Sequence, residues 1–441
     1  MLFLFACTPW YLECPSSKVP GGMTFVEGWQ VATPQSVPYV SRLNMSAQIS
    51  FFPVDNGDMT LIEFESGNRL LIDVNIRADA DDPDEDVPDV ATMLRERLDT
   101  DDKGRLYVDA FLLSHPDEDH CRGLETHFHL GDPDDWKKSD DKILIREMWS
   151  SPIVFRRKDR AGSGLCKDAE AWWAEARRRV KKHKNGAGDN DGDRILILGE
   201  DVDGKTDGLE EILISVDEEF NNISGELDSS MMARLLGPLP KQDSEYDEKA
   251  LEKNRSSVIV RFQIEADANE DACRYLTGGD AEVAIWERIW DKHQEQVGWI
   301  DYDILQTPHH CSWHCLSHDS WSEADNPAVS DDARSALSQT RDGAYLVASS
   351  KPIKDDDSDP PCIGAKREYE SIASDADGEF ICVMEEIDKD DPEPIVFEID
   401  ENGPDRAGPT NKSGPIGPSN FTKSGGDPDK PVQRDKGRRY A

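Results

Sequence analysis

From residue 46 onward, short apolar runs alternate with clusters of turn-forming residues. The runs at 47–52, 59–64 and 69–74 have the length of β-strands and are rich in Leu, Ile and Phe. Between them lie the segments DNGD at 55–58 and SGN at 66–68, which are typical of tight turns. This pattern predicts three strands in an antiparallel meander.

The rest of the chain alternates helical patterns with buried strands. Residues 90–98 and 167–184 have helical spacing, and 109–113 is a short apolar run that ends at Ser114 and His115. Further strands are predicted at 195–198, 211–216, 256–264, 273–277, 303–306, 344–348 and 379–384, with a helix over 281–290. The alternation indicates a layered α/β domain.

Changes in composition suggest three segments. Residues 1–44 have few periodic signals and are expected to be an N-terminal leader or extension, whereas 45–400 is expected to form the main domain. Within it, 127–250 is interpreted as an inserted region. Residues 401–441 are rich in Pro and Gly and carry more basic than acidic side chains, which predicts a disordered basic tail.

The charge and cysteine content limit which partners, metal motifs and cellular compartments fit the sequence. A net charge of −41 repels nucleic acid at long range, so any site for a polyanion must be locally positive. The nine cysteines are scattered and form no CxxC pair, which argues against a zinc ribbon and suits a reduced cytosol. No apolar run reaches the length of a membrane helix. We therefore expect a cytoplasmic protein without membrane association.

Four candidate metal ligands fall within six residues, directly after the predicted strand at 109–113. They are His115, Asp117, Asp119 and His120. Imidazole and carboxylate are the usual ligands of zinc, manganese and iron. Taken alone, the segment could also be a solvated acidic turn.

Two later strand ends carry similar side chains. Asp280 follows the strand at 273–277 through two glycines, and could bridge two metal ions or simply cap the next helix. His309 and His310 follow the strand at 303–306, and could be ligands or structural histidines. The three segments together favour a metal centre more than any one of them does.

These motifs, in this order, resemble the metallo-β-lactamase superfamily, whose hallmark is H-x-H-x-D-H. Here Asp117 replaces the second histidine, which is similar to the β-lactamase-like domain of the ComEC/Rec2 competence proteins, in a free-standing form without their membrane channel. Further matches are NRSSVIV at 254–260, TGGDAE at 277–282, TPHHCS at 307–312, and the opening meander with VDNGD at 54–58 and LID at 71–73. The resemblance implies an α/β fold of the αββα sandwich type.

The chain departs from that pattern in three places. The family's third-motif histidine has no counterpart between His120 and Asp280, and 143–153 contains none. Cys311 stands where glycine is usual, and one extra glycine precedes Asp280. One metal site is therefore expected to be rich in oxygen ligands or completed by water.

The resemblance implies two divalent metal ions, zinc or manganese. His115 and Asp117 would hold one ion; Asp119, His120 and one of His309 and His310 would hold the other, with Asp280 bridging them. Asp119 and Asp280 are the expected catalytic residues, Asp119 also accepting a proton from a bridging water. Asp73 and Glu282 are candidates for orienting the ligands.

The leading hypothesis is a phosphodiesterase or nuclease acting on DNA or RNA. A basic helical stretch beside Trp172 and Trp173 could hold a nucleic-acid backbone and stack a base, or could be a surface helix with buried tryptophans. Its cationic residues are Arg177, Arg178, Arg179, Lys181 and Lys182. Two alternatives stay open: a hydrolase of small esters, lactones or phosphoesters, and a weakly catalytic module that binds a protein partner in an assembly, such as a defence complex.

Overall fold

The computed structural model describes residues 46–81, 87–152, 164–201, 204–240 and 256–408. The chain divides into two units between Leu43 and Asn44, and the described residues all belong to the second unit. The predicted leader at 1–44 and the part of the predicted tail from 409 on lie outside the described residues.

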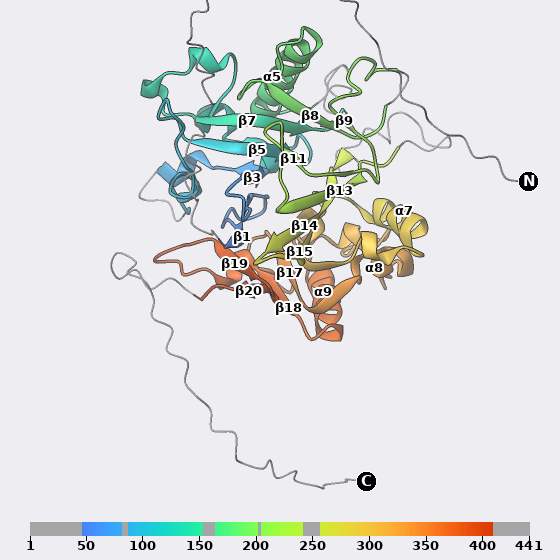
Figure 1. The fold of residues 1–441 in the computed structure, drawn as a ribbon. Coiled ribbons are helices and arrows are strands. Elements are labelled where there is room, and N and C mark those ends of the chain that lie inside the picture. Colours follow the sequence, from blue (N-terminus) through green and yellow to red (C-terminus); the bar gives the residue numbers. More distant parts are fainter. Residues whose placement is uncertain (1–45, 82–86, 153–163, 202–203, 241–255, 409–441) are drawn as a thin grey trace, which may run out of the picture. The chain divides into compact units, whose positions relative to one another are not determined.

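The first sheet combines the opening meander with a parallel half (Figure 1). Strands β1, β2 and β3 pair antiparallel as predicted, and β3, β5, β7, β8 and β9 then pair in parallel. The strands are β1 (Ala47–Phe51), β2 (Thr60–Glu63), β3 (Arg69–Ile72), β5 (Tyr107–Leu113), β6 (Phe128–His129), β7 (Ile143–Ser150), β8 (Arg194–Leu198), β9 (Leu213–Ile214), β19 (Ile395–Asp400) and β20 (Gly403–Arg406).

The second sheet is built the same way, with an antiparallel half followed by a parallel half. Strands β13, β14 and β15 pair antiparallel, and β15, β16, β17 and β18 pair in parallel. The strands are β10 (Glu219–Phe220), β13 (Met231–Gly237), β14 (Ile259–Ala266), β15 (Asn269–Thr277), β16 (Tyr302–Gln306), β17 (Thr340–Ala348) and β18 (Glu379–Cys382). Outside both sheets are β4 (Val74–Asn75) and the hairpin of β11 (Asn222–Ile223) and β12 (Glu226–Leu227).

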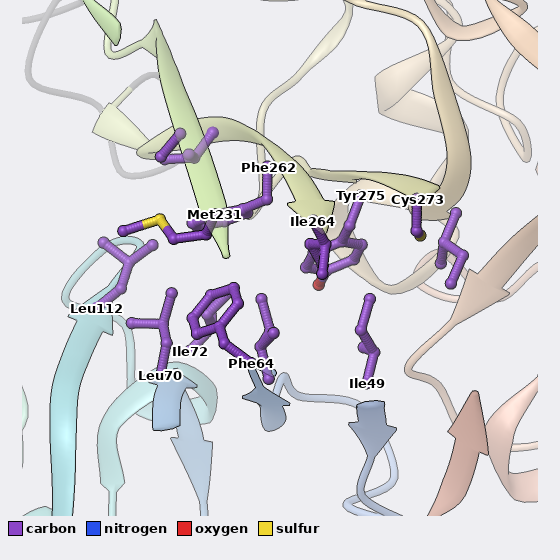
Figure 2. Packing of buried hydrophobic residues seen from close by; sticks show 14 of the residues in the cluster. Ile49, Phe64, Leu70, Ile72, Leu112, Met231, Phe262, Ile264, Cys273 and Tyr275 are labelled. Carbon is purple, nitrogen blue, oxygen red and sulfur yellow. The ribbon is translucent and has the colours of Figure 1, made fainter. Parts of the chain in front are cut away.

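Side chains from the two sheets meet in a continuous apolar layer. Leu70, Ile72 and Leu112 of the first sheet face Met231 and Phe262 of the second (Figure 2). All of these side chains are at most 2% exposed. Burial of this layer holds the sheets face to face, and it supplies the main driving force for their association.

Helices cover the outer faces of both sheets. An apolar cluster joins the outer face of the first sheet to α1, α2, α3 and α5, and another joins the second sheet to α7, α8 and α9. The α-helices are α1 (Val90–Arg95), α2 (Glu118–Cys121), α3 (Leu124–His127), α5 (Lys167–Lys184), α7 (Val283–His293), α8 (Asp331–Leu337), α9 (Ile363–Asp375) and α10 (Val383–Glu386). The 3-10 turns are η1 (Ala78–Asp81), η2 (Pro133–Asp135), η3 (Lys138–Asp140), η5 (Val297–Trp299), η6 (Pro308–His310) and η7 (Trp313–Cys315). The layer order is helix, sheet, sheet, helix, so the expected α/β sandwich is confirmed.

The domain boundaries stay a prediction, but the structure places the residues of the predicted insertion. Strands β7 and β8 lie beside β5 in the first sheet, and β13 lies beside β14 in the second. Residues 127–250 therefore contribute to both sheets. The predicted disorder of 401–441 does not hold at its start, because β20 pairs with β19. Among the described residues, no helix is long and apolar enough to cross a membrane.

Trp172 tests the packing of α5 on the first sheet. Its ring centroid lies 5.1 Å from that of Phe111, and its Nε1 donates to Ser150 Oγ at 3.1 Å. We expect Trp172→Ala to lower the free energy of unfolding by about 3–5 kcal/mol, because it leaves a cavity. Urea denaturation measures this loss. The exposed Arg177, changed to Ala, is the control and should cost about 0.5 kcal/mol or less.

Candidate metal centre

The candidate ligands lie at the carboxyl ends of the parallel strands of both sheets. Asp73 follows β3, and Ser114 and His115 follow β5. In the second sheet Asp280 follows β15, and His309 follows β16. The backbone N–H of Val258 donates to Ser114 O at 2.9 Å, which joins the two sheets at this edge. Segments that are far apart in the sequence therefore meet at one site.

A close turn after β1 brings Asp58 to the same place. The N–H of Asp58 donates to Asp119 O at 3.2 Å. Gly57 permits this approach, because its φ is +150° and a Cβ there would lie 2.8 Å from Asp119 O and 2.1 Å from Asn75 Nδ2. The Asn75 amide in turn donates to the carbonyls of Val54 and Asn56 at 3.1 and 3.0 Å, which fixes the turn.

The turn after β16 presents two imidazoles through an unusual backbone. His309, His310 and Cys311 have φ values of 49°, 53° and 67°, so three successive non-glycine residues are left-handed. This conformation is strained and needs support from its surroundings. The N–H of His309 donates to Gly279 O at 2.8 Å, and that of Cys362 donates to Cys311 O at 3.0 Å. The segment after β15 and the N-cap residue of α9 thus hold the turn.

The Asp280 carboxylate lies in the middle of the cluster, and each of its oxygens faces a different pair of imidazoles. Its Oδ1 is 3.1 Å from His120 Nε2 and 3.6 Å from His310 Nε2. Its Oδ2 is 3.3 Å from His115 Nε2 and 3.6 Å from His309 Nε2. The two oxygens therefore divide the four histidines into two sets.

One further carboxylate joins each set. Asp119 Oδ2 is 3.4 Å from His310 Nε2, and Asp117 Oδ2 is 3.8 Å from His115 Nε2. The sequence left open which of His309 and His310 contributes a ligand. His310 lies beside Asp119, whereas His309 faces the same Asp280 oxygen as His115.

The donor atoms and their spacing fit divalent metals. Bonds of about 2.0–2.2 Å place neighbouring ligand atoms about 3.0–3.5 Å apart around an ion, and the nitrogen–oxygen distances here run from 3.1 to 3.8 Å. Among the described residues, the Nε2 atoms of His115, His120 and His310 and the Oδ1 atom of Asp280 are buried without a hydrogen-bond partner. Such atoms are costly to bury unless they bind something. The cluster can therefore hold divalent metal.

Asp73 and Ser114 orient two of the imidazoles from behind. Asp73 Oδ2 is 2.8 Å from His120 Nδ1 and accepts the Ser114 hydroxyl at 2.5 Å. Ser114 Oγ is 3.1 Å from His115 Nδ1, so it can accept that ring's N–H while it donates to Asp73. Both rings then keep a proton on Nδ1 and direct Nε2 toward Asp280, where a bound metal would replace the Nε2 proton. One buried carboxylate thus sets the tautomer of both histidines.

Asp58 has a similar orienting position. Together with His120, Asp280 and His310 it forms a buried group whose ligand atoms lie within 4.8 Å of one another. Its oxygens, however, face the Nδ1 atoms, at 3.4 Å from His310 and 3.8 Å from His120. Asp280 faces the Nε2 atoms of the same rings. Because Asp58 faces the Nδ1 side, it leaves Nε2 for a metal, so we assign Asp58 to positioning.

The carboxylates and imidazoles of the cluster stabilise each other's ionised forms. Burial would lower the pKa of His120, but the carboxylates of Asp280 and Asp73 outweigh it and raise that pKa well above its usual value. Against the same burial, Asp280 and Asp119 raise the pKa of His310 to about 10. Burial would raise the pKa of Asp280, yet the surrounding imidazoles hold it well below its usual range. A cation that binds here displaces protons from the rings.

Among the predicted site residues, Glu282 lies at the edge of the cluster. It is the N-cap residue of α7, two residues after Asp280. Burial lowers the pKa of His309, and the nearby Glu282 carboxylate opposes this shift only in part. Sequence reasoning missed Asp58 and Ser114 as site residues. Asp58 ends the turn that the DNGD pattern identified, and Ser114 directly precedes His115.

The predicted nucleic-acid contacts are mostly engaged within the protein. Arg179 is 1% exposed, bonds to Glu175 at 2.7 Å and donates to the carbonyl of Ile145 at 3.0 Å, so it is not available to a ligand. Arg178 pairs with Glu175 and Asp193. Lys182 pairs with Asp132 and Asp193 at 3.2 and 3.4 Å.

Arg177 and Lys181 are the exposed members of the basic stretch. They lie toward the C-terminal end of α5, whereas its N-terminal end contacts α2. At 1.5 Å per residue, Arg177 is about 17 Å along the helix from Cys166. The basic surface is therefore smaller than the sequence suggests and lies away from the metal ligands.

Comparisons with known proteins add little. No family model matches the chain, and no curated protein matches it. Among solved structures, the chain is similar to the crystal structure of unliganded yeast PDE1, with 11% identity and a TM-score of 0.36 over 76% of this chain and 96% of that chain. At this level the similarity carries no argument about the site.

Variants of Asp58 and Asp280 separate positioning from ligation. We expect Asp58→Asn to weaken metal binding by about 10- to 100-fold, because an orienting partner is lost. Asp280→Ala should weaken it further, because it removes the oxygens that face both sets of imidazoles. Competition with a chromogenic chelator measures both, and Asp342→Asn, at an exposed position of β17, is the control. If Asp58→Asn were as damaging as Asp280→Ala, Asp58 would be a ligand.

Proposed function

We propose that this protein is a metal-dependent hydrolase of phosphodiesters that uses a pair of divalent ions, zinc or manganese. The observation that carries the proposal is the position of Asp280, whose two oxygens face two separate sets of ligands. Two ions held by these residues would supply hydroxide near neutral pH and polarise the phosphoester.

The chain's own residues then have distinct roles. His120, His310 and Asp119 form the set at Asp280 Oδ1, and His115, His309 and Asp117 form the set at Oδ2. Asp73, Ser114 and Asp58 fix ring orientation from the Nδ1 side.

Asp119 combines contact with the cluster and access to solvent. Its side chain is 36% exposed, while its Oδ2 lies 3.4 Å from His310 Nε2. Because imidazole contacts outweigh its partial burial, the pKa of Asp119 lies well below its usual value and it stays ionised. Its partial exposure lets water reach it, and on this ground we propose Asp119 as the acceptor of a proton from the attacking water; its lowered pKa makes it a weak base for that step.

For the substrate we propose a DNA or RNA strand, in line with the resemblance to the competence proteins. The net charge of −41 opposes loose binding of polyanions. Recognition would therefore depend on the metal centre itself, with Arg177 and Lys181 among the exposed cations of α5.

A second candidate is the hydrolysis of a small ester, lactone or phosphoester. It is favoured by the internal pairing of Arg178, Arg179 and Lys182, which removes most of the basic surface that a polynucleotide needs. A module that binds a protein partner is the further alternative from the sequence. The missing third-motif histidine and the large insertion motivate it, and His309, 3.6 Å from Asp280 Oδ2, weakens the first of these reasons.

A cleavage assay tests the proposal. Metal-loaded full-length protein should cleave a phosphodiester in a panel of single- and double-stranded DNA, RNA and bis(p-nitrophenyl) phosphate. Asp280→Ala should reduce the rate by more than about 100-fold, because it removes the bridging carboxylate. Asp342→Asn should match the wild type. Equal rates in wild type and Asp280→Ala would discard metal-dependent catalysis at this cluster.

Double substitution of Arg177 and Lys181 by Gln distinguishes the substrate classes. If a polynucleotide lies along α5, the double variant should raise the KM for DNA or RNA several-fold and reduce its salt dependence. The kcat/KM for the small ester should not change. A preference for small esters, lactones or thioesters over every polynucleotide would select the second candidate.

A further inference from the structure

Two cysteines meet where α2 ends and α5 begins. Cys121 Sγ and Cys166 Sγ are 3.6 Å apart, although the residues are 45 positions apart in sequence. Cys121 is buried and directly follows His120. Cys166 is the N-cap of α5, where its Sγ accepts the N–H of Ala169 at 3.4 Å.

The two ends are held together without the cysteines. The carboxylate of Asp168, in the first turn of α5, accepts the N–H of Gly123 at 3.0 Å and that of Glu125 at 2.8 Å. These bonds fix the helix start against the segment that follows α2. The sulfur atoms therefore approach as part of a docked interface.

Cys166 differs from the other described cysteines in its access to solvent. It is half-buried, whereas Cys121, Cys273, Cys311, Cys315, Cys362 and Cys382 are buried. Contact with the Cys121 sulfur, and then the hydrogen bond from the Ala169 N–H, lower the pKa of Cys166 to about 7. A large fraction of Cys166 is then thiolate near neutral pH, which is the form that reacts with oxidants.

We propose that Cys166 and Cys121 form a reversible redox pair. A hydroperoxide oxidises Cys166, and Cys121 then forms a disulfide with it, next to the candidate ligand segment 115–120. This site is independent of the proposed hydrolase activity. Closing it requires the sulfurs to move from 3.6 Å to about 2.0 Å, the length of a disulfide bond.

The chemistry balances with one hydroperoxide. The Cys166 thiolate attacks the outer peroxide oxygen, the O–O bond breaks, and the leaving alkoxide or hydroxide takes a proton. Cys166 is then a sulfenic acid. The Cys121 sulfur attacks the Cys166 sulfur and loses its proton as the S–O bond breaks and water leaves. Two thiols are oxidised and one peroxide is reduced.

The link would connect α5 covalently to the residue after His120. His120 Nε2 is 3.1 Å from Asp280 Oδ1, so the modified residue adjoins the candidate metal centre. Cys121 Sγ also lies 3.0 Å from Asp117 O, and it exchanges this contact for the bond to Cys166.

Peptide mapping of the full-length protein tests the pair. After treatment with hydrogen peroxide and separation without reductant, we expect a cross-linked peptide pair containing Cys121 and Cys166. Its mass should be about 2 Da below the sum of the free peptides, and dithiothreitol should reverse the change. The map also distinguishes links made by Cys7 or Cys14, which lie outside the described residues.

The control variants exploit two helix caps. Cys166→Ser keeps an acceptor at the start of α5 and should abolish the link. Cys362→Ser makes the same change at the N-cap of α9, where Sγ accepts the N–H of Gly364 at 3.3 Å, and should leave the link intact. In Cys121→Ala, a sulfenic acid at Cys166 should become trappable by dimedone.

Three results would overturn the proposal. The first is no loss of thiol at Cys166 under conditions that oxidise glutathione. The second is a link from Cys166 to another cysteine. The third is oxidation of Cys121 in Cys166→Ser to the same extent as in the wild type. Circular dichroism of each variant shows whether it is folded, so Cys166→Ser keeps the test decisive even if Cys121→Ala unfolds.

Discussion

The site depends on one carboxylate being buried among four imidazoles. Asp280 is 3% exposed, and in an apolar interior an isolated charge of this kind would be strongly unfavourable. The surrounding rings make its ionised form stable and leave their Nε2 atoms directed at its two oxygens. The positions of Asp58, Asp73 and Ser114 follow from the same requirement, because the rings must be fixed from the opposite side.

The sandwich makes this arrangement possible by aligning strand ends. Parallel strands end at the same edge of a sheet, and the two sheets face each other across a continuous apolar layer. The chain therefore needs only short turns after β3, β5, β15 and β16 to bring ligands together. The bond from Val258 to Ser114 O fixes the relative position of the two edges.

Local patterns predicted much of the fold, because meander strands and amphipathic helices have clear periodicity. Helix 167–184 was predicted with its observed bounds, and the H-x-D-x-D-H segment located the centre. Strand β7 was missed because Arg146 and Glu147 interrupt its apolar run, and Arg179 looked accessible because its partners Glu175 and Ile145 are recognised only in three dimensions. The division of His309 and His310 depends on their left-handed backbone, which spacing does not encode.

The left-handed run from His309 to Cys311 has a consequence for cation choice. Each such residue costs on the order of 1–3 kcal/mol, and tertiary contacts meet that cost during folding. The imidazoles of His309 and His310 are then fixed before any ion binds, so they cannot easily move apart for a larger one. If the cluster binds the proposed ions, we would expect it to favour small divalent ions over calcium. A short peptide with the same residues would lack that selectivity.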